Sequence, residues 1–369
     1  MKKGKILLVG AGGQMGGYYM NALLNDLGIP PCQIVAVDID PDKIAKFREK
    51  YPDVTIISNL DEEVDIHEGF LAVKPASGIK TAIVTTYTPS HHLVIVDLIK
   101  RGVENIFTEK PLALDSDKVA YIRANMKPNT KIYTAFLINF SGGVKFVEDF
   151  MIKEELYLSE AFVNWGKDRT GDNRPTPGDL EDESVHGIGV VHILSRINQT
   201  VKNIRIMANL SYLDYVDPIV QAKAHGMDES FPLPADVNSS SFISETIETN
   251  RGTILAGTRS SYVNIQQVRQ MNLILSGIAS GKPEYLIEIN FDTKEGDVLL
   301  VKKTGAKEIA IHAFAGNKKI TEETHAFLKV VAGQAQDPRL TDFAAAETAV
   351  VVSDAVKKSH RTNTMVTVV

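Results

Sequence analysis

A chain of 369 residues, 44% hydrophobic and 23% charged, is long enough for two hydrophobic cores and has the composition of a globular protein. Its net charge of -6 argues against nucleic acid and acidic lipid as partners. No stretch approaches the ~20 apolar residues of a membrane helix, and the single cysteine, Cys32, excludes an intramolecular disulfide and a cysteine-rich metal site. We therefore expect a soluble, cytoplasmic protein without a metal centre.

The first third of the chain alternates short apolar runs with helical patterns. Buried strands separated by helices are typical of a parallel, doubly wound sheet. We therefore expect residues 1–135 to form a dinucleotide-binding Rossmann domain. Its predicted helices include Tyr18–Leu27, Lys43–Tyr51 and Leu93–Arg101. Its predicted strands are Ile6–Val9, Ile34–Val37, Val54–Ile57, Ala82–Thr86, Asn105–Phe107 and Lys131–Ala135.

After about residue 136 the pattern changes to longer, β-rich segments. We expect residues 136–369 to form an α+β domain on a large, mainly antiparallel open sheet, which binds substrate and mediates oligomerisation. The last helix, residues 342–359, is a candidate to pack back on the first domain, and another helical pattern covers Glu322–Gln336. The predicted strands are Glu160–Trp165, Val201–Leu213, Ser240–Glu248, Thr253–Val263, Met271–Leu275, Tyr285–Asn290 and Asp297–Val301.

A glycine-rich turn, Gly10-Ala11-Gly12-Gly13-Gln14-Met15-Gly16, follows the first predicted strand and opens a helix. Strand, turn and helix in this order suit a dinucleotide, because backbone N–H groups and the helix N-terminus receive its pyrophosphate. The spacing departs from G-x-G-x-x-G, since Met15 takes the third glycine position when counted from Gly10. Read as Gly10-x-x-Gly13-x-x-Gly16, the turn resembles that of dihydrodipicolinate reductase and similar Rossmann enzymes.

Asp38 ends the second predicted strand, 22 residues after Gly16. A carboxylate about 20 residues beyond the glycine turn typically binds the ribose hydroxyls of the cofactor. Its charge would repel a 2′-phosphate. We therefore expect NAD rather than NADP.

The segment Thr88-Pro89-Ser90-His91-His92 stands where the fourth predicted strand gives way to a helix. In a Rossmann domain this strand end faces the cofactor. We expect one of the two histidines to touch ribose or substrate and the other to be exposed, and the sequence does not choose between them. Ser90 can also act as the N-cap of the following helix, and the two roles are compatible.

Glu109-Lys110-Pro111 follows the fifth predicted strand. Proline removes a backbone donor and holds the preceding residue in extended geometry, so the backbone directs the Lys110 side chain. One interpretation is therefore an ammonium group with a defined direction. The alternative interpretation is a solvated exit from the strand.

The segment from Gly178 to His186 carries the clearest acid–base pattern of the second domain. If it is helical, Asp182 and His186 lie four residues apart on one face, where the carboxylate can fix the tautomer of the imidazole. The alternative is an ordinary helix ion pair. His192 lies in an apolar run and is predicted to be structural, and its six-residue distance from His186 does not suit a helical metal site.

Taken together, these motifs resemble those of the Gfo/Idh/MocA family of NAD(P)-dependent oxidoreductases, which includes inositol and glucose-fructose dehydrogenase types. Asn250-x-Gly252 and the Ala/Val-rich last helix are also similar to the family, so that the resemblance covers essentially the whole chain. It implies hydride transfer between NAD and a hydroxyl or carbonyl carbon of a sugar, polyol or related compound. It also implies a homodimer or homotetramer formed through the C-terminal sheet.

The resemblance assigns roles to individual residues. Lys110 would bridge the nicotinamide ribose and the substrate, and the Lys110–Pro111 bond would be cis. His186 would be the general base, with Asp182 as its partner. Contacts to the substrate are expected from Lys110, Asn139, Arg169, Asp182 and His186. Contacts to the cofactor are expected from Gly10, Gly12, Gly13, Gln14, Met15, Gly16, Asp38, Thr88, Pro89, His91, His92, Glu109 and Lys110.

The chain departs from the family pattern in two places. Gly189 stands where the family often has an aspartate three residues after the histidine, and an arginine-containing segment is replaced around Asn139. Trp165, Lys167 and Arg169 are candidates for new substrate contacts, although Arg169 can equally be a solvated loop charge. Two other functions remain open: a non-catalytic NAD-sensing regulator, and an imine or enone reductase with a histidine acid.

Overall fold

The computed structural model describes residues 5–60, 78–168, 178–211, 239–293, 296–314 and 318–368. The predicted substrate contact Arg169 lies outside these residues. The chain divides into two compact units, the first made of Met1–Leu137 with Lys318–Val350 and the second of Ile138–Asn317 with Val351–Val369. Among the described residues, no helix has both the length and the hydropathy to cross a membrane.

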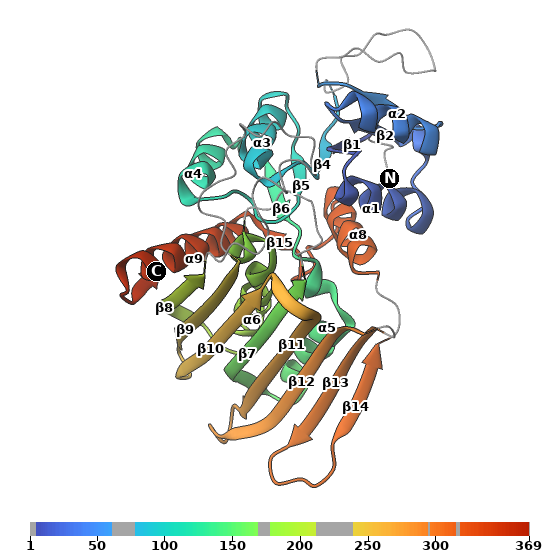
Figure 1. The fold of residues 1–369 in the computed structure, drawn as a ribbon. Helices are drawn as coiled ribbons and strands as arrows, with labels where there is room; N and C mark the ends of the chain where they lie inside the picture. Colours follow the sequence, from blue (N-terminus) through green and yellow to red (C-terminus); the bar gives the residue numbers. More distant parts are fainter. Residues whose placement is uncertain are drawn as a thin grey trace. The chain divides into compact units, whose positions relative to one another are not determined.

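The first unit is built on a seven-stranded sheet with the order β15-β6-β5-β4-β1-β2-β3 (Figure 1). Every neighbouring pair is parallel except β15 and β6. The order 3-2-1-4-5-6 is that of the doubly wound dinucleotide-binding fold, which confirms the predicted fold class. The strands are β1 (Ile6–Val9), β2 (Ile34–Val37), β3 (Thr55–Ile57), β4 (Thr81–Val84), β5 (Asn105–Thr108), β6 (Lys131–Thr134) and β15 (Thr341–Asp342).

Helices lie beside this sheet, and their apolar sides join its core. All residues of β1, β2 and β4 are buried, as expected for a parallel sheet covered on both faces. The described helices are α1 (Gln14–Asn21), α2 (Pro41–Lys50), α3 (His91–Lys100), α4 (Ser116–Asn125) and α8 (Lys319–Val331).

The C-terminal part of the chain contributes to the first unit, which differs from the boundary predicted at residue 136. Phe327 of α8 stacks on Phe107 of β5 with 5.1 Å between ring centroids. Helix α9 (Phe343–Thr362) starts in this unit, where Phe343 and Val350 join the core cluster. Apolar faces of distant helices thus complete the core, and helical periodicity alone does not reveal which core a helix joins.

The second unit is built on a nine-stranded sheet with the order β14-β13-β12-β11-β7-β10-β9-β8-β16. Among the described strands of this sheet, only β10 and β7 pair in parallel, so the predicted large, mainly antiparallel sheet is confirmed. Helices α5 (Gly142–Lys153) and α6 (Val185–Leu194) lie behind the sheet in Figure 1. The strands are β7 (Leu156–Asp168), β8 (Val201–Ser211), β9 (Ser240–Thr249), β10 (Thr253–Ser261), β11 (Val263–Gly277), β12 (Pro283–Thr293), β13 (Gly296–Lys303), β14 (Ala310–Phe314) and β16 (Val366–Val368).

Candidate functional site

The glycine turn joins β1 to α1 with backbone approaches that allow no side chain. Gly10 has a φ of +85°, and a Cβ there would lie 2.8 Å from the carbonyl carbon of Thr85. A Cβ on Gly16 would lie 2.5 Å from the carbonyl oxygen of Gly10. These two glycines therefore bring the start of α1 tightly against the ends of β1 and β4.

The start of α1 is suited to an anion. Its N-cap residue, Gly13, provides no side-chain cap, and the first turn contains no acidic residue. A helix N-terminus presents backbone N–H groups and a partial positive charge. Because it follows β1 and neighbours the end of β4, it lies at the point where the strand order reverses, which is where doubly wound folds bind dinucleotides. The turn thus fits a pyrophosphate.

Asp38 ties the glycine turn to the end of β2. Its Oδ2 accepts a hydrogen bond from the Gly12 backbone N–H at 2.8 Å, and its Oδ1 accepts one from the Asp40 N–H at 3.1 Å. Asp40 in turn caps α2 by accepting from the N–H groups of Asp42 and Lys43. A carboxylate has further lone pairs beyond these two bonds. Asp38 is thus positioned beside the turn as the ribose-binding prediction requires.

The exit from β4 is also fastened to the glycine turn. The Thr85 hydroxyl donates to the Val9 carbonyl oxygen at 3.0 Å. A short 3-10 turn, Thr88–Ser90, follows and leads into α3. Ser90 occupies the predicted N-cap position, but its hydroxyl donates back to the Tyr87 carbonyl oxygen at 2.7 Å and makes no capping bond.

His91 links this exit to the Glu109-Lys110-Pro111 loop. Its ring is fully buried, with Nδ1 2.8 Å from the Pro111 carbonyl oxygen and Nε2 2.9 Å from the Thr86 carbonyl oxygen. Burial lowers the pKa of His91, so the ring is neutral at neutral pH and donates to one carbonyl at a time. This placement favours a structural role for His91 rather than a cofactor contact.

His92 is partly buried and lies against α4. Its ring meets the Tyr121 ring edge-on, with 6.2 Å between centroids. Burial is the main cause that lowers the pKa of His92, and the charge of Lys118 is the next. The expectation that one of the two histidines is exposed is therefore wrong, because His91 is buried and His92 is partly buried.

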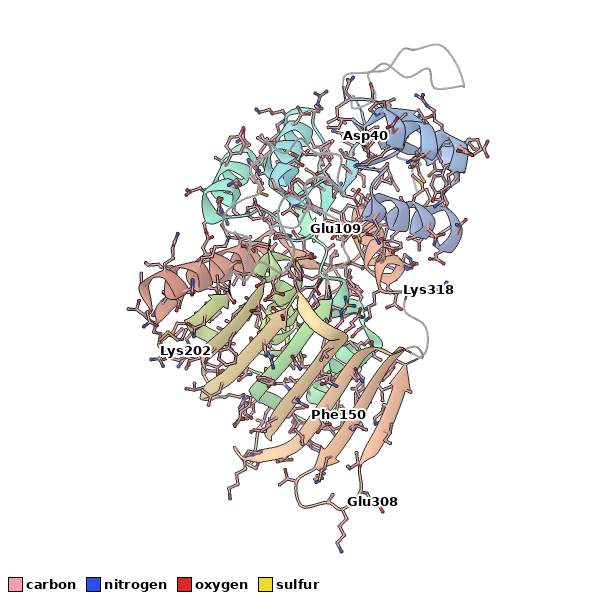
Figure 2. All side chains as sticks on the ribbon, in the orientation of Figure 1. Asp40, Glu109, Phe150, Lys202, Glu308 and Lys318 are labelled. Atoms are coloured by element: carbon pink, nitrogen blue, oxygen red, sulfur yellow. The ribbon has the colours of Figure 1, made fainter. Side chains whose placement is uncertain are left out.

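The Glu109-Lys110-Pro111 loop begins directly after β5. Glu109 is 7% exposed, and its Oε1 accepts a hydrogen bond from the Tyr19 hydroxyl of α1 at 2.9 Å. The backbone N–H of Glu109 donates to the Val84 carbonyl oxygen at 2.9 Å. The Lys110–Pro111 bond is cis, as the resemblance implied. Lys110 therefore lies in a loop that α1, β4 and His91 all contact (Figure 2 labels Glu109 beside α1).

A second carboxyl group, that of Glu323 on α8, is buried near Glu109. Glu323 accepts the backbone N–H of Phe136 at 2.7 Å. Burial first, and then the charge of Glu109, raises the pKa of Glu323 well above its usual value. Both causes favour the protonated form of the Glu323 carboxyl group. No sequence motif singles out Tyr19 or Glu323, because their contacts to Glu109 and Phe136 join positions far apart in the chain.

In the second unit, Asp182 lies in a π-helical turn, Leu180–Ser184, and His186 lies in α6, which follows. The segment is helical as predicted, and these two residues lie about one turn apart. The Tyr262 hydroxyl is 3.0 Å from Oδ2 of Asp182 and 2.9 Å from the Gly178 carbonyl oxygen. His186 is 9% exposed and packs its ring against Trp165, with 5.8 Å between centroids.

Behind this turn lies a buried cluster of Asp179, Ser184, Ser241 and Ser260. The Ser184 hydroxyl lies 2.6 Å from that of Ser241, and the Ser260 hydroxyl donates to Oδ2 of Asp179. Burial raises the pKa of Asp179 to about 8, against the hydrogen bond from Ser260, which lowers it. Asp179 is therefore largely protonated at neutral pH, and it adds little charge near Asp182.

The remaining sequence predictions have different outcomes. Asn139, a predicted substrate contact, is 1% exposed in the 3-10 turn Leu137–Phe140. Trp165, a candidate for a new contact, is fully buried. His192 is buried with its Nε2 2.8 Å from Oε2 of Glu245, which confirms the predicted structural role. Within the described residues, no three His, Cys, Asp or Glu side chains converge on a position for a metal ion.

Solved structures similar to this chain include oxidoreductases and sugar dehydrogenases. A proposed NADPH-dependent oxidoreductase from Desulfitobacterium hafniense DCB-2 is 15% identical with a TM-score of 0.74, over 100% of this chain and 98% of that one. An oxidoreductase from Sinorhizobium meliloti is 12% identical with a TM-score of 0.73, over 99% and 100%. Levoglucosan dehydrogenase, in complex with NADH and L-sorbose, is 16% identical with a TM-score of 0.72, over 100% of both chains. At these identities the similarity shows the shared fold.

No curated protein matches the chain in sequence. The N-terminal region does match a family model. Residues 4–135 match that of GFO_IDH_MocA, described as an oxidoreductase family with an NAD-binding Rossmann fold. This agrees with the glycine turn, with Asp38 beside it and with the strand order of the first unit. This region of the chain is therefore similar to the NAD-binding Rossmann region of the GFO_IDH_MocA oxidoreductases.

Proposed function

We propose that the protein is an NAD-dependent dehydrogenase that transfers a hydride between nicotinamide and a hydroxyl or carbonyl carbon of a sugar, polyol or related small molecule. The observation that carries this proposal is the Lys110 loop at the carboxyl end of β5. Tyr19 donates a hydrogen bond to Glu109, and a ring nitrogen of His91 lies beside the carbonyl oxygen of Pro111. The loop lies at the carboxyl ends of the parallel strands, as does the glycine turn that follows β1. These contacts fix the backbone on both sides of Lys110, as a lysine with a defined catalytic position requires.

The first unit would hold the cofactor through its backbone. The N–H groups of the turn from Gly10 to Gly16 would receive the pyrophosphate, and Asp38 would accept hydrogen bonds from the ribose hydroxyls. The charge of Asp38 disfavours a 2′-phosphate, which is why NAD rather than NADP is proposed. When bound, NAD supplies the hydride acceptor.

The side chains of Lys110, Asp182 and His186 would handle the proton. His186 would take the proton of the substrate hydroxyl as the hydride leaves the same carbon, and would return it in the reverse direction. Asp182, fixed by the Tyr262 hydroxyl at 3.0 Å, would orient the imidazole. The ammonium of Lys110 would stabilise the negative charge that develops on the substrate oxygen.

The similarity to levoglucosan dehydrogenase, solved with NADH and L-sorbose, supports a carbohydrate as the substrate. The test is a panel of polyols, aldoses and aldonic acids, each offered with NAD and with NADP while nicotinamide absorbance is followed. We expect turnover of at least one polyol or aldose with NAD. NAD binding without turnover on the whole panel would instead support a regulatory protein.

Turnover should depend on the two proposed side chains. Lys110→Met and His186→Asn should each lower kcat by about 100-fold or more, within the range of general acid–base and electrostatic contributions. The exposed Lys131 and His325 provide matched controls, since Lys131→Met and His325→Asn remove the same groups from the surface. Unchanged kcat in both test variants would contradict the assigned roles.

We further propose that the protein forms a homo-oligomer through the open face of the nine-stranded sheet. Large apolar side chains on adjacent strands of this face are exposed, with Phe162 at 43%, Phe242 at 49% and Leu255 at 58%. An antiparallel sheet with one helical layer leaves its other face to be covered. Light scattering should show a dimer or tetramer in the wild type, and a smaller species after Phe242→Glu with Leu255→Glu. A monomeric wild type would contradict the proposal.

A further inference from the structure

Trp165 and Arg269 form a pair across two strands of the second unit. They are register partners on the antiparallel strands β7 and β11, so their side chains lie on the same face of the sheet. The Arg269 guanidinium lies over the indole, 5.4 Å from its centroid. The guanidinium of Arg269 therefore covers one side of the buried indole.

Glu183 connects the pair to the turn that precedes α6. The indole Nε1–H of Trp165 donates to Oε2 of Glu183 at 3.0 Å, and the same oxygen is 4.0 Å from a terminal nitrogen of Arg269. Glu183 is 2% exposed. A carboxylate this deeply buried needs a charge partner and a hydrogen bond, and Arg269 and Trp165 supply them.

The indole of Trp165 also supports the ring of His186. The two rings are tilted by 35° with 5.8 Å between their centroids. The centroid of the Phe291 ring lies 5.5 Å from that of the indole. Trp165 is fully buried, so it has no surface for a dissolved substrate. Any effect of Trp165 on the chemistry must therefore pass through a neighbour, and His186 is the neighbour with acid–base capacity.

We propose that Trp165 is a positioning residue for His186, and that Glu183, with Arg269, holds its indole in the orientation that aligns the imidazole. The inference rests on the proposed function, in which His186 is the general acid–base. A base must lie within hydrogen-bond reach of the proton it takes, and small misplacements reduce the rate strongly. A loss of indole orientation should therefore lower kcat more than it weakens binding.

Three substitutions distinguish the effect of the hydrogen bond between Trp165 and Glu183 from the effect of packing around the indole. Trp165→Phe keeps an aromatic ring but removes the N–H donor. Glu183→Leu removes the acceptor and the charge, whereas Glu183→Gln keeps an oxygen that accepts from the indole. We expect Trp165→Phe and Glu183→Leu to lower kcat by about 10- to 100-fold with little change in substrate KM. Glu183→Gln should restore kcat to within a few fold of the wild type.

The orientation of His186 can be read without turnover. Histidine labelled with ¹³C in its ring gives one signal for each of the 9 histidines, and His186→Asn assigns the one of interest. We expect the His186 signal to shift or broaden in Trp165→Phe and Glu183→Leu, and to stay near its wild-type position in Glu183→Gln. The signal of His192, which pairs with Glu245 in the same unit, should stay unchanged and so report an intact core.

The proposal is overturned if Trp165→Phe leaves both kcat and the His186 signal unchanged. It is also overturned if Glu183→Gln lowers kcat as much as Glu183→Leu does, because the oxygen that accepts the indole N–H would then not contribute to the rate. If Glu183→Leu fails to fold, as a changed His192 signal would reveal, Trp165→Phe decides alone. Absence of turnover in the wild type would count against the proposed function, whereas the ring signals would still test the anchoring.

Discussion

The two units place their polar groups in different ways. In the first unit the backbone builds the candidate cofactor site: a glycine turn, a helix N-terminus and a lysine loop lie at the carboxyl ends of parallel strands. In the second unit side chains build a separate polar cluster: Asp182 contacts Tyr262, which lies between β10 and β11, and His186 packs against Trp165 of β7. A backbone-built site requires particular residues at fixed spacing and so leaves a motif, whereas a side-chain cluster leaves almost none.

The sharpest test of the backbone-built site is Gly16→Ala. The added methyl group would overlap the Gly10 carbonyl oxygen at 2.5 Å, so the turn must shift. We expect NAD affinity to fall by more than tenfold and the free energy of unfolding to fall by about 1–3 kcal/mol, as for other overpacked sites. Fluorescence titration with NADH and urea denaturation measure the two effects.

The adjacent Gly17 provides the matched control. A Cβ on Gly17 meets no atom within 4 Å. Because it lies inside α1, Gly17→Ala should keep NAD affinity and raise the free energy of unfolding by about 0.5–1 kcal/mol. Equal loss of affinity in both variants would mean that the helix, and not the close approach at Gly16, governs binding.

In the second unit the largest expected effect concerns pH and stability. The pKa of Asp179 in the folded protein is about 8, far above its usual value, because of burial. Between pH 4 and 8 the Asp179 carboxyl group is therefore protonated in the folded state and ionised in the unfolded state. As pH rises through this range, this group lowers the free energy of unfolding by up to about 1.4 kcal/mol per pH unit. Below pH 4 both states are protonated and the effect vanishes.

Asp179→Asn should remove this dependence. Urea denaturation at several pH values should show that the variant gains stability relative to the wild type as pH rises from 4 to 8. The comparison uses the slope, because an amide also changes the bonds to Ser260. A constant difference between the two proteins across this range would contradict a raised pKa for Asp179.

A smaller effect is expected for Tyr19→Phe in the first unit. This change removes the hydroxyl that donates to Glu109 at 2.9 Å in a buried site, which should cost about 1–3 kcal/mol of unfolding free energy. Tyr18 is 48% exposed, so Tyr18→Phe should change stability by less than about 0.5 kcal/mol. If both variants have the same free energy of unfolding, the hydrogen bond between Tyr19 and Glu109 does not stabilise the fold.

The smallest expected effect is on cofactor choice. Asp38→Asn keeps an oxygen that accepts the Gly12 N–H and removes the negative charge. We expect NAD affinity to fall by about tenfold, equivalent to about 1.4 kcal/mol and typical of a hydrogen bond to a charged group, while NADP affinity does not fall. Parallel titrations with NADH and NADPH measure the ratio. An unchanged ratio would show that Asp38 does not select the cofactor.

The sequence predicted the first unit well because its constraints are local. Gly10 and Gly16 are required by close backbone approaches, and Asp38 and Lys110 follow strands that could be identified as apolar runs. The last helix was expected as a candidate to pack on this unit, but the sequence did not predict that α8 completes it as well. Glu323 reaches Phe136 across 187 positions of the chain, and no periodicity marks such a contact.

The second unit was predictable only in outline. The sheet and the helical Asp182 and His186 segment were predicted, but Glu183 and Arg269 were not, since they meet only after β7 and β11 pair. His91 was expected to contact a ligand or to be exposed, yet it is fully buried with both ring nitrogens beside carbonyl oxygens. The sequence alone does not distinguish a titratable side chain with a catalytic role from one with a structural role.

The central claim is that the first unit binds the cofactor and that His186 of the second unit transfers the proton. The most direct test measures NADH affinity and kcat in the same proteins. Gly16→Ala should lose NADH affinity, whereas His186→Asn should keep it within about twofold and lose kcat by about 100-fold or more. The exposed-site control His325→Asn should change neither quantity. The account is contradicted if His186→Asn keeps wild-type kcat, or if it weakens NADH binding as much as Gly16→Ala does.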